Sequence, residues 1–320
     1  MTKANRRKKV GRNAKSFILS LLIGIAATMS CRAERNLLTL DVWDRDESAT
    51  ALRSAADAPQ FSLAAETLGT PSQVSPLVAP VEDLFKKNYW YLVVLDVKEV
   101  FTAPVRWDTR DWLVLGGVAA GIGTVAVFDE DIQRAIQRNR GNTVKDIFDG
   151  VEPLGNEYAI GVVGTFYLAG EIFKDPRAKT TALDAISASA IASGIVTNSL
   201  KYVIGRSRPI DREGAYTFQP FSGKDSFSSG HTSEAFALAS VISDHYDSRW
   251  VQFTSYGLAS MVGYARLMDN RHWTSDVLAG AAIGTFVGKT VVHFNQKHRN
   301  VSLQPIVGPD IHGAEISLSW

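Results

Sequence analysis

Three short clusters between residues 201 and 276 contain the side chains of this sequence that are best suited to chemistry. In the first cluster, Lys201 precedes Arg208 by seven residues, and Pro209 follows directly. Seven residues make about two helical turns, so we expect both basic side chains on one face of a helix that ends at the proline. Basic residues near a helix C-terminus also complement the helix dipole, so this cluster alone is a weak signal.

The second cluster, Ser228-Ser229-Gly230-His231, stands directly before an apolar stretch that we predict to be helical. Ser229 and Gly230 would leave backbone N–H groups free at the helix start, where such groups bind anions. His231 would then stand beside a bound anion. The alternative interpretation is an N-cap serine followed by an incidental histidine.

The third cluster contains Arg266, His272 and Asp276. His272 and Asp276 are four residues apart, so the carboxylate can reach the imidazole if the turn between them is helical. A carboxylate on Nδ1–H fixes the tautomer and leaves Nε2 free as a nucleophile or base. The alternative interpretation is a surface His–Asp pair of little energetic weight.

Together the clusters supply cations, neutral N–H donors, acid–base groups and a nucleophile. A tetrahedral oxyanion such as phosphate needs this combination, because arginine forks bind its oxygens in pairs and positive charge opposes the charge that develops during transfer. The sequence shows no metal-ligand cluster, so we expect the cations to do the work that magnesium does elsewhere, and no cofactor. The phosphate-binding candidates are Lys201, Arg208, Ser229, Gly230 and Arg266, and the catalytic candidates are His272, His231 and Asp276.

In order and spacing, the patterns Lys-x6-Arg-Pro, Ser-Gly-His and Arg-x5-His-x3-Asp resemble the type-2 phosphatidic acid phosphatase and vanadium haloperoxidase superfamily. The resemblance is strong over the motif region, 201–276, and looser over 111–294. Two positions depart from the common pattern. Ser228 stands where a proline is usual, and Ala265 stands where a serine usually precedes the arginine, which removes a hydroxyl contact to phosphate.

The resemblance implies a role for each candidate. His272 would attack phosphorus and form a phosphohistidine, and Asp276 would orient it. His231 would protonate the leaving oxygen and then help to activate water. The five phosphate-binding candidates would hold the phosphoryl oxygens. We interpret Arg206 and Arg271 as supporting or surface residues, and the histidines at 245, 293, 298 and 312 as structural or exposed.

The elements that position these residues are predicted to be helices, and the predicted fold is an all-α bundle of the kind that this superfamily has. The expected helical domain covers 81–298. Within it, 88–100 fits either a strand or a buried helix. The tail, 299–320, alternates around a Gly-Pro turn and predicts a β-hairpin of strands 301–307 and 314–320. The predicted helices are 112–128, 129–138, 157–173, 182–203, 231–245, 250–267 and 276–294.

These helices leave the relation to a membrane open. The run 112–128 has no charge and lies at the short end of the spanning range. The other runs are interrupted by charges, which are costly in lipid, so we expect a soluble or peripheral bundle ahead of a polytopic one. The interrupting residues are Glu171, Asp184, Glu234, Asp244 and Lys289.

The N-terminus has the pattern of an export signal over 1–33, with seven basic residues and no acidic one in 1–30 and an apolar run at 16–27. We expect cleavage near Ala33, with lipid attachment at Cys31 and an uncut anchor as alternatives. Residues 34–80 show no sustained period and are predicted to be a flexible leader. Cys31 is the single cysteine, which excludes an internal disulfide, and the net charge of +1 indicates no general affinity for nucleic acid.

We therefore expect an exported, periplasmic or envelope-associated enzyme, with membrane anchoring as an alternative. The predicted activity is metal-independent hydrolysis of a phosphate ester, either a lipid phosphate or a small phosphomonoester of the kind that the similar class A acid phosphatases cleave. Two other functions stay open. The same anion cage would hold vanadate in a haloperoxidase, and a non-catalytic envelope protein could bind phosphate without turnover.

Overall fold

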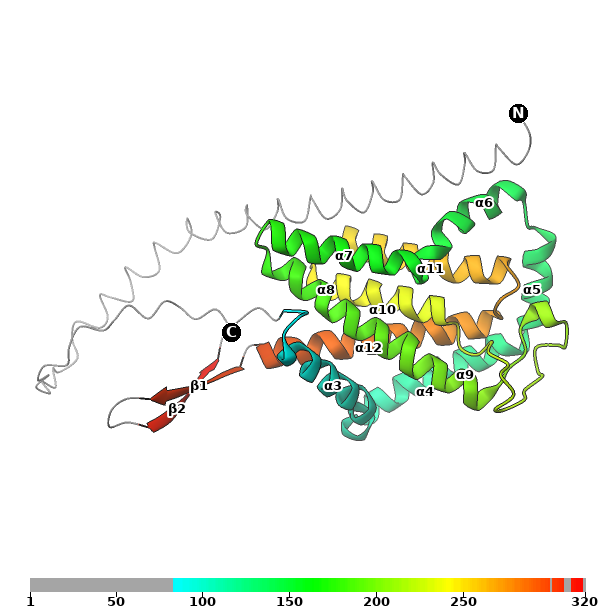
Figure 1. The fold of residues 1–320 in the computed structure, drawn as a ribbon. Helices are drawn as coiled ribbons and strands as arrows, with labels where there is room; N and C mark the ends of the chain where they lie inside the picture. The colour runs from blue at the N-terminus through cyan, green and yellow to red at the C-terminus, as the bar shows by residue number, and fades with distance from the viewer. Residues whose placement is uncertain (1–82, 300, 308–311, 319–320) are drawn as a thin grey trace, which may run out of the picture.

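The computed structural model describes residues 83–299, 301–307 and 312–318 (Figure 1). In these ranges the chain is a helical bundle followed by one hairpin, which confirms the predicted all-α class. The predicted export signal and leader lie outside the described residues. The α-helices are α3 (Lys87–Thr102), α4 (Thr109–Val127), α5 (Asp129–Arg138), α6 (Asn142–Val151), α7 (Glu157–Ile172), α8 (Pro176–Ser189), α9 (Asn198–Ile204), α10 (Gly230–His245), α11 (Arg249–Met268) and α12 (Thr274–Arg299).

Two local results refine the sequence predictions. The segment that fits either a strand or a helix is α3. The predicted helix 182–203 is a longer rod, in which the π-helical segment η3 (Ala190–Thr197) joins α8 to α9. This rod begins at Asp175, whose carboxylate accepts from the N–H groups of Arg177 and Ala178, with Pro176 in the first helical position.

The tail forms the predicted antiparallel hairpin. Strand β1 (Val301–Val307) pairs with β2 (His312–Leu318), so that Val301 lies opposite Leu318 and Val307 lies opposite His312. The second strand begins two residues earlier than the sequence predicts. The hairpin follows directly after α12 (Figure 1).

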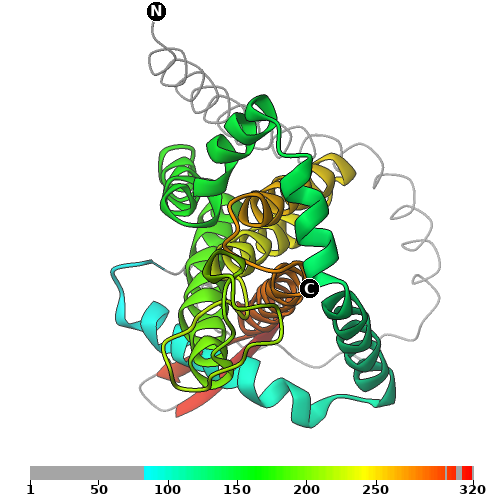
Figure 2. The same ribbon diagram turned by 90° about the vertical axis from the view of Figure 1, so that its right-hand side faces the viewer.

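Helix α10 lies inside the bundle and packs against α7, α8, α11 and α12 (Figures 1 and 2). Its contact with α12 is main chain against main chain, because α12 presents Gly280, Gly284 and Gly288 to it. A Cβ at Gly280 would lie 2.6 Å from the carbonyl oxygen of Ser229, and one at Gly288 would lie 2.8 Å from that of Ala237. These glycines therefore set the distance between the two helices.

At the far end of α10 and α12, a buried polar cluster closes the bundle. The carboxylate of Asp184 accepts hydrogen bonds from Asn295 at 2.9 Å and from Arg299 at 2.7 and 2.9 Å. The ring of His245 lies 2.7 Å from the same carboxylate. Since α8, α10 and α12 all contribute, the cluster fixes these helices relative to one another.

The charges that interrupt the apolar runs are largely paired within the fold. Besides Asp184, the Lys289 ammonium lies 2.8 Å from Asp244, and Glu171 lies 2.5 Å from Lys179. Pairing removes the main objection to a lipid environment. Three segments of the described chain are long and apolar enough to cross a membrane: α4, the rod Pro176–Ile204, and α12.

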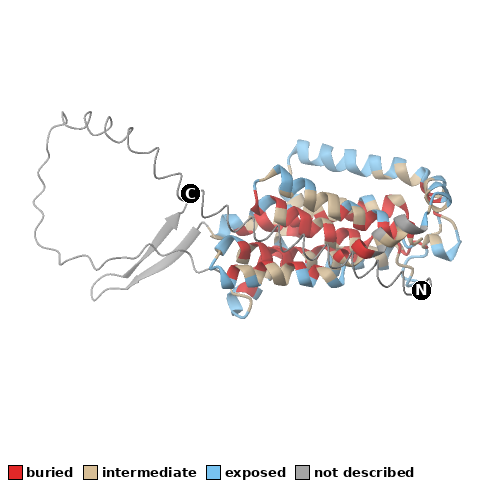
Figure 3. Cartoon of the chain, turned by 90° about the horizontal axis from the view of Figure 1, so that it is seen from above, coloured by how far each residue is buried: buried red, intermediate tan, exposed pale blue. Residues whose placement is uncertain are grey.

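Helix α4 is the clearest of these, since its most apolar window has no buried residue. It lies along one side of the bundle and is exposed over nearly its whole length (Figure 3). Further large apolar side chains are exposed on other helices, among them Ile160, Leu168, Trp250 and Phe253. Such a surface is typical of contact with lipid, so the structure points to a membrane-anchored protein, whereas the sequence favoured a soluble or peripheral bundle.

Candidate active site

The three predicted clusters meet at one end of the bundle, where α9 and α11 end and α10 and α12 begin (Figure 1). The main chains of Ser229 and Asp276 are hydrogen-bonded to each other there, and the Lys201 ammonium lies beside Gly230. This end brings together all eight predicted site residues: Lys201, Arg208, Ser229, Gly230, His231, Arg266, His272 and Asp276.

The first cluster is not one helix. Helix α9 ends at Ile204, because Gly205 adopts a left-handed conformation with φ of 59° and donates its N–H to the carbonyl of Lys201. Any side chain at position 205 would collide with the main chain of Gln219. Arg208 therefore lies in an extended loop, and the predicted helical face shared with Lys201 is wrong.

His272 is buried, with an exposed fraction of 1%, and its Nδ1 lies 2.8 Å from the carbonyl oxygen of Ser226. A carbonyl only accepts, so Nδ1 carries the proton and Nε2 of the neutral ring keeps its lone pair. Burial, with the nearby charges of Arg266, Arg208 and Lys201, holds the pKa of His272 well below its usual value. The ring is therefore neutral at neutral pH and has the form that a nucleophile needs.

Asp276 does not hold the imidazole directly. Its Oδ2 lies 4.0 Å from Nδ1 of His272, beyond hydrogen-bond distance. The same oxygen accepts from the Ser226 hydroxyl at 2.6 Å and from the N–H of Trp273 at 2.8 Å. Asp276 thus fixes the two segments that flank the imidazole, and the direct carboxylate–histidine contact predicted from the spacing is replaced by one through Ser226.

Both arginines of the predicted phosphate site are paired with carboxylates. Arg208 makes two hydrogen bonds with Asp225, at 2.8 and 2.6 Å. Arg266 pairs with Glu152, whose carboxylate also lies 3.9 Å from Nε2 of His231. The Nε of Arg266 is buried without a partner among the described residues. The two arginines are thus held in place by carboxylates, and an incoming phosphate group must compete with these carboxylates for the guanidinium groups.

At the start of α10, one of the two backbone N–H groups that were predicted to be free is already hydrogen-bonded. The N–H of Ser229 is not free, since it donates to the carbonyl of Asp276 at 3.1 Å. Within the described chain, the N–H groups of Gly230 and His231 have no backbone acceptor, as expected for the first turn of a helix. The candidate anion-binding donors are therefore shifted by one residue, to the N–H groups of Gly230 and His231.

A cavity of about 380 Å³ opens at this end of the bundle. Its lining includes His231, whose pKa is lowered by burial and by the charges of Lys201 and Arg208. In the part of the chain that the structure describes, no group of three or more His, Cys, Asp or Glu residues is arranged to hold a metal ion. The cavity is lined by Glu152, Ile210, His231, Arg266, Asp269 and Arg271.

Three residues of the site escape the sequence reasoning, and a fourth, Arg206, was singled out by it without a defined role. Arg206, interpreted as a supporting or surface residue, is 2% exposed and pairs with Asp129 and Asp276. Asp129, Ser226 and Glu152 belong to no recognised motif. Of these four residues, only Arg206, two positions before Arg208, carries a signal in the sequence.

Residues 183–300 match the family model described as the PAP2 superfamily. This segment is therefore similar to the PAP2 superfamily. The resemblance that the motifs carry is thereby confirmed. The matched segment runs from the middle of α8 to the end of α12 and contains every predicted site residue.

Members of this superfamily are similar to the chain. Lipid A 1-phosphatase of Porphyromonas gingivalis is 42% identical over 102 residues, which cover 31% of this chain and 20% of that protein. Lipid A 1-phosphatase of Rhizobium etli is 27% identical over 197 residues, or 57% of this chain and 82% of that protein. The match to the first relative thus spans about a fifth of its length. Among solved structures, LpxE of Aquifex aeolicus has a TM-score of 0.43 at 23% identity, covering 52% of this chain and 95% of that chain.

The position of Glu152 predicts that this carboxylate lowers the affinity of the candidate site for phosphate. Glu152→Gln keeps the shape of the side chain and removes the charge that competes for Arg266. We expect the inhibition constant of inorganic phosphate to fall about tenfold, which corresponds to about 1.4 kcal/mol. The matched control is Glu99→Gln, which removes a carboxylate paired with Arg106 outside the cavity. A weaker inhibition by phosphate in Glu152→Gln would instead mean that Glu152 holds Arg266 in its binding position.

Proposed function

We propose that this protein is a membrane-anchored phosphatase that hydrolyses a lipid phosphomonoester through a phosphohistidine on His272, without a metal ion. The observation that carries the proposal is the state of His272: a buried, neutral ring beside three cationic side chains, whose Nδ1 is occupied and whose Nε2 has no partner among the described residues. A neutral nucleophile in a field of positive charge suits attack on an anionic phosphorus centre.

In the first half of the reaction, Nε2 of His272 forms a bond to phosphorus while the bond from phosphorus to the lipid oxygen breaks. His231 gives its proton to that oxygen, which leaves as a neutral alcohol. In the second half, His231 takes a proton from water, the water oxygen bonds to phosphorus, and the phosphorus–nitrogen bond breaks. Inorganic phosphate leaves, and His272 is neutral again.

The remaining candidates stabilise the charge on the transferred group. Lys201 has no hydrogen bond or ion pair within the described residues, so its ammonium is available to a phosphoryl oxygen. Arg208 and Arg266 supply two forks, and the N–H groups of Gly230 and His231 supply neutral donors. Asp276 acts as a positioning residue through Ser226.

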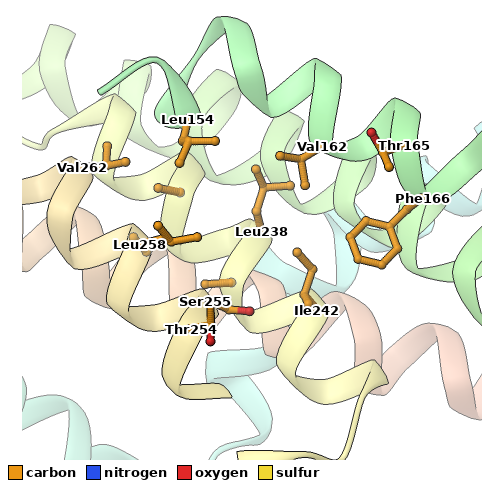
Figure 4. A pocket seen from close by; sticks show the side chains of 13 residues that line it. Leu154, Val162, Thr165, Phe166, Leu238, Ile242, Thr254, Ser255, Leu258 and Val262 are labelled. Atoms are coloured by element: carbon orange, nitrogen blue, oxygen red, sulfur yellow. The ribbon is translucent and has the colours of Figure 1, made fainter. Parts of the chain in front are cut away.

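Three observations support a lipid as the substrate over a small ester. The two relatives named above are lipid A phosphatases. Three helices are long and apolar enough to cross a membrane. A small apolar groove of about 70 Å³ also lies between α7, α10 and α11 (Figure 4). Its end at Leu154 and Val262 is within about one helical turn of Glu152 and Arg266, so an apolar chain could lie in the groove while its phosphate occupies the site.

The proposal places the active site on the outer side of the cytoplasmic membrane. The basic segment and apolar run at the N-terminus support export. The exposed apolar helix α4 and the two further segments that are long and apolar enough to cross a membrane support retention in the membrane after export. Whether Cys31 carries a lipid or is removed with the signal does not affect this orientation.

The test uses the full chain, purified in detergent and assayed with EDTA present. We expect phosphate release from dispersed phosphatidate at a kcat/KM at least about tenfold above that for a small aryl phosphate. Loss of activity in EDTA and recovery with a divalent metal would contradict the metal-independent mechanism. Vanadate-dependent oxidation of bromide by peroxide, without phosphate release, would favour the haloperoxidase, and neither activity would favour a binding protein.

A variant of the groove separates the lipid from the small ester. Ser255 lines the groove and Ser260, five residues later on α11, is exposed and does not. Ser255→Phe should lower kcat/KM for phosphatidate about tenfold and leave the aryl phosphate unchanged, because the added ring fills space that the lipid chain needs. Ser260→Phe should change neither. An equal loss on both substrates would remove the groove from the lipid site.

A further inference from the structure

The guanidinium of Arg206 lies buried between two buried carboxylates at the base of the site. Its Nη2 is 2.8 Å from Asp129 and its Nη1 is 2.6 Å from Asp276. Nη1 also lies 2.7 Å from the Ser275 hydroxyl, and Nε donates to the carbonyl of Ala215 at 2.9 Å. Arg206 is 2% exposed and both carboxylates are fully buried, so the group is shut off from solvent.

This group reaches His272 through Ser226. The N–H of Ser226 donates to the carbonyl of Arg206 at 3.0 Å, and its hydroxyl donates to Asp276 at 2.6 Å. Its carbonyl accepts from Nδ1 of His272 at 2.8 Å. Ser226 is therefore fixed at three points. The main-chain carbonyl of Arg206 accepts one of these hydrogen bonds. Its guanidinium holds Asp276, which accepts the second.

Asp129 completes the arrangement from α5. Its carboxylate accepts from the N–H of Ser275 at 2.9 Å and from the Ser275 hydroxyl, in addition to Arg206. It thus caps the first turn of α12, the helix that begins with the residues after His272. The carboxylates of Asp129 and Asp276 share one guanidinium, so the charge of Arg206 is divided between them.

The charges around His272 are unequal on its two sides. Lys201 and Arg208 approach from the side of α9 and the following loop, Arg266 approaches from α11, and all three oppose a positive charge on the ring. His231 stands at the start of α10. On the other side Asp276, 4.0 Å from Nδ1, favours a positive ring. Arg206 is the cation that neutralises Asp276, and a protonated Nε2 could not attack phosphorus.

We propose that Arg206 is a positioning residue for the reaction: it fixes Ser226 and Asp276 against His272 and withholds the charge of Asp276 from the nucleophile, with Asp129 as its counter-ion. The role rests on the proposed function, because it assigns a task to a group that acts through His272. It follows that Arg206 governs the protonation of the nucleophile without touching the substrate.

The test compares Arg206→Gln, Arg206→Lys and Asp129→Asn in the full chain, with kcat and KM measured against pH on an aryl phosphate. In Arg206→Gln the uncompensated Asp276 stabilises the protonated ring. The pKa of His272 rises, and the acid limb of kcat/KM moves to higher pH by about one unit or more. We expect kcat at neutral pH to fall at least about tenfold while KM changes less than about threefold. Arg206→Lys should recover part of both.

Asp129→Asn should shift the acid limb of kcat/KM in the opposite direction. Without Asp129, more of the Arg206 charge falls on Asp276, so the acid limb should move to lower pH. This variant keeps the proposal testable even if Arg206→Gln does not fold. Arg134→Gln, which removes an exposed arginine of α5, is the control and should leave the limb unchanged. If the acid limb of kcat/KM lies at the same pH in every variant as in the wild type, and only turnover or thermal stability falls, then Arg206 is a structural residue and the proposal is overturned.

A second readout separates this proposal from the proposed function. Carbon-13 labelled histidine gives an NMR titration of His272, assigned by the loss of its signal in His272→Gln. The shift upward in Arg206→Gln and downward in Asp129→Asn should appear in this titration even in a protein that hydrolyses no ester. Turnover by the wild type with no such shifts would contradict the role of Arg206 alone, and shifts without turnover would contradict the phosphatase alone.

Discussion

His272→Ala should remove phosphate release from every ester, with a loss of at least about 10⁴-fold in kcat. The alanine removes the only buried neutral ring that faces Lys201, Arg208 and Arg266 in the described part of the chain. Water would then have to attack phosphorus without a covalent step. The measurement is the rate of phosphate release from the aryl phosphate, whose good leaving group makes the nucleophilic step visible.

The control for this variant is His293→Ala, which removes an exposed histidine near the far end of α12. It should keep wild-type activity. A stronger form of the experiment traps the intermediate: wild type quenched in denaturant during turnover of radiolabelled substrate should carry label on His272 that is lost in acid and kept in base. Label on another residue, or turnover within about tenfold of wild type in His272→Ala, would show that His272 is not the nucleophile.

His231→Ala should slow the reaction most for substrates whose leaving group is a strong base and therefore needs protonation. A lipid alkoxide is a poor leaving group, so we expect about a 10³-fold loss on phosphatidate. A nitrophenolate leaves without help, so the aryl phosphate should lose about tenfold or less in its first step. The comparison of the two substrates in one variant is the measurement, because a general loss of structure would slow both equally.

The pH profile provides the second half of this prediction. Burial and the charges of Lys201 and Arg208 lower the pKa of His231, so its protonated form is present only on the acid side of neutral. Rate on phosphatidate should therefore fall as pH rises through that pKa, and the alkaline limb should vanish in His231→Ala. Lys289→Gln, which removes a lysine paired with Asp244 far from the site, serves as control. An unchanged alkaline limb would assign the proton to another group.

The sequence predicts eight site residues in three motifs, and motif spacing records only what lies near in the chain. All eight predicted residues meet at one end of the bundle. Three details of the predicted geometry differ in the structure, one because of a local turn and two because of contacts between distant parts of the chain. Gly205 turns the chain before Arg208, the Ser229 N–H is taken by the carbonyl of Asp276, and Ser226 stands between Asp276 and His272.

The residues that the sequence missed are joined across long stretches of chain. Asp129 meets Arg206 across 77 residues, and Glu152 meets Arg266 across 114. Such pairs follow from how helices pack, which spacing does not encode. The expectation of a soluble or peripheral bundle rests on the same limit, because a charge such as Asp184 appears costly in a helix until its partner Arg299, 115 residues away, is in place.

The glycine contact between α10 and α12 has a consequence for biosynthesis. The main chain of α12 holds the start of α10 in place, since the N–H of Ser229 donates to the carbonyl of Asp276 and Gly280 packs against the carbonyl of Ser229. During translation, Lys201, Arg208 and His231 therefore leave the ribosome well before the helix that completes their site. A nascent chain that stops short of α12 holds most of the reactive groups without the geometry to use them. If the proposed function is correct, the site is complete only when the last helix of the described bundle has been made.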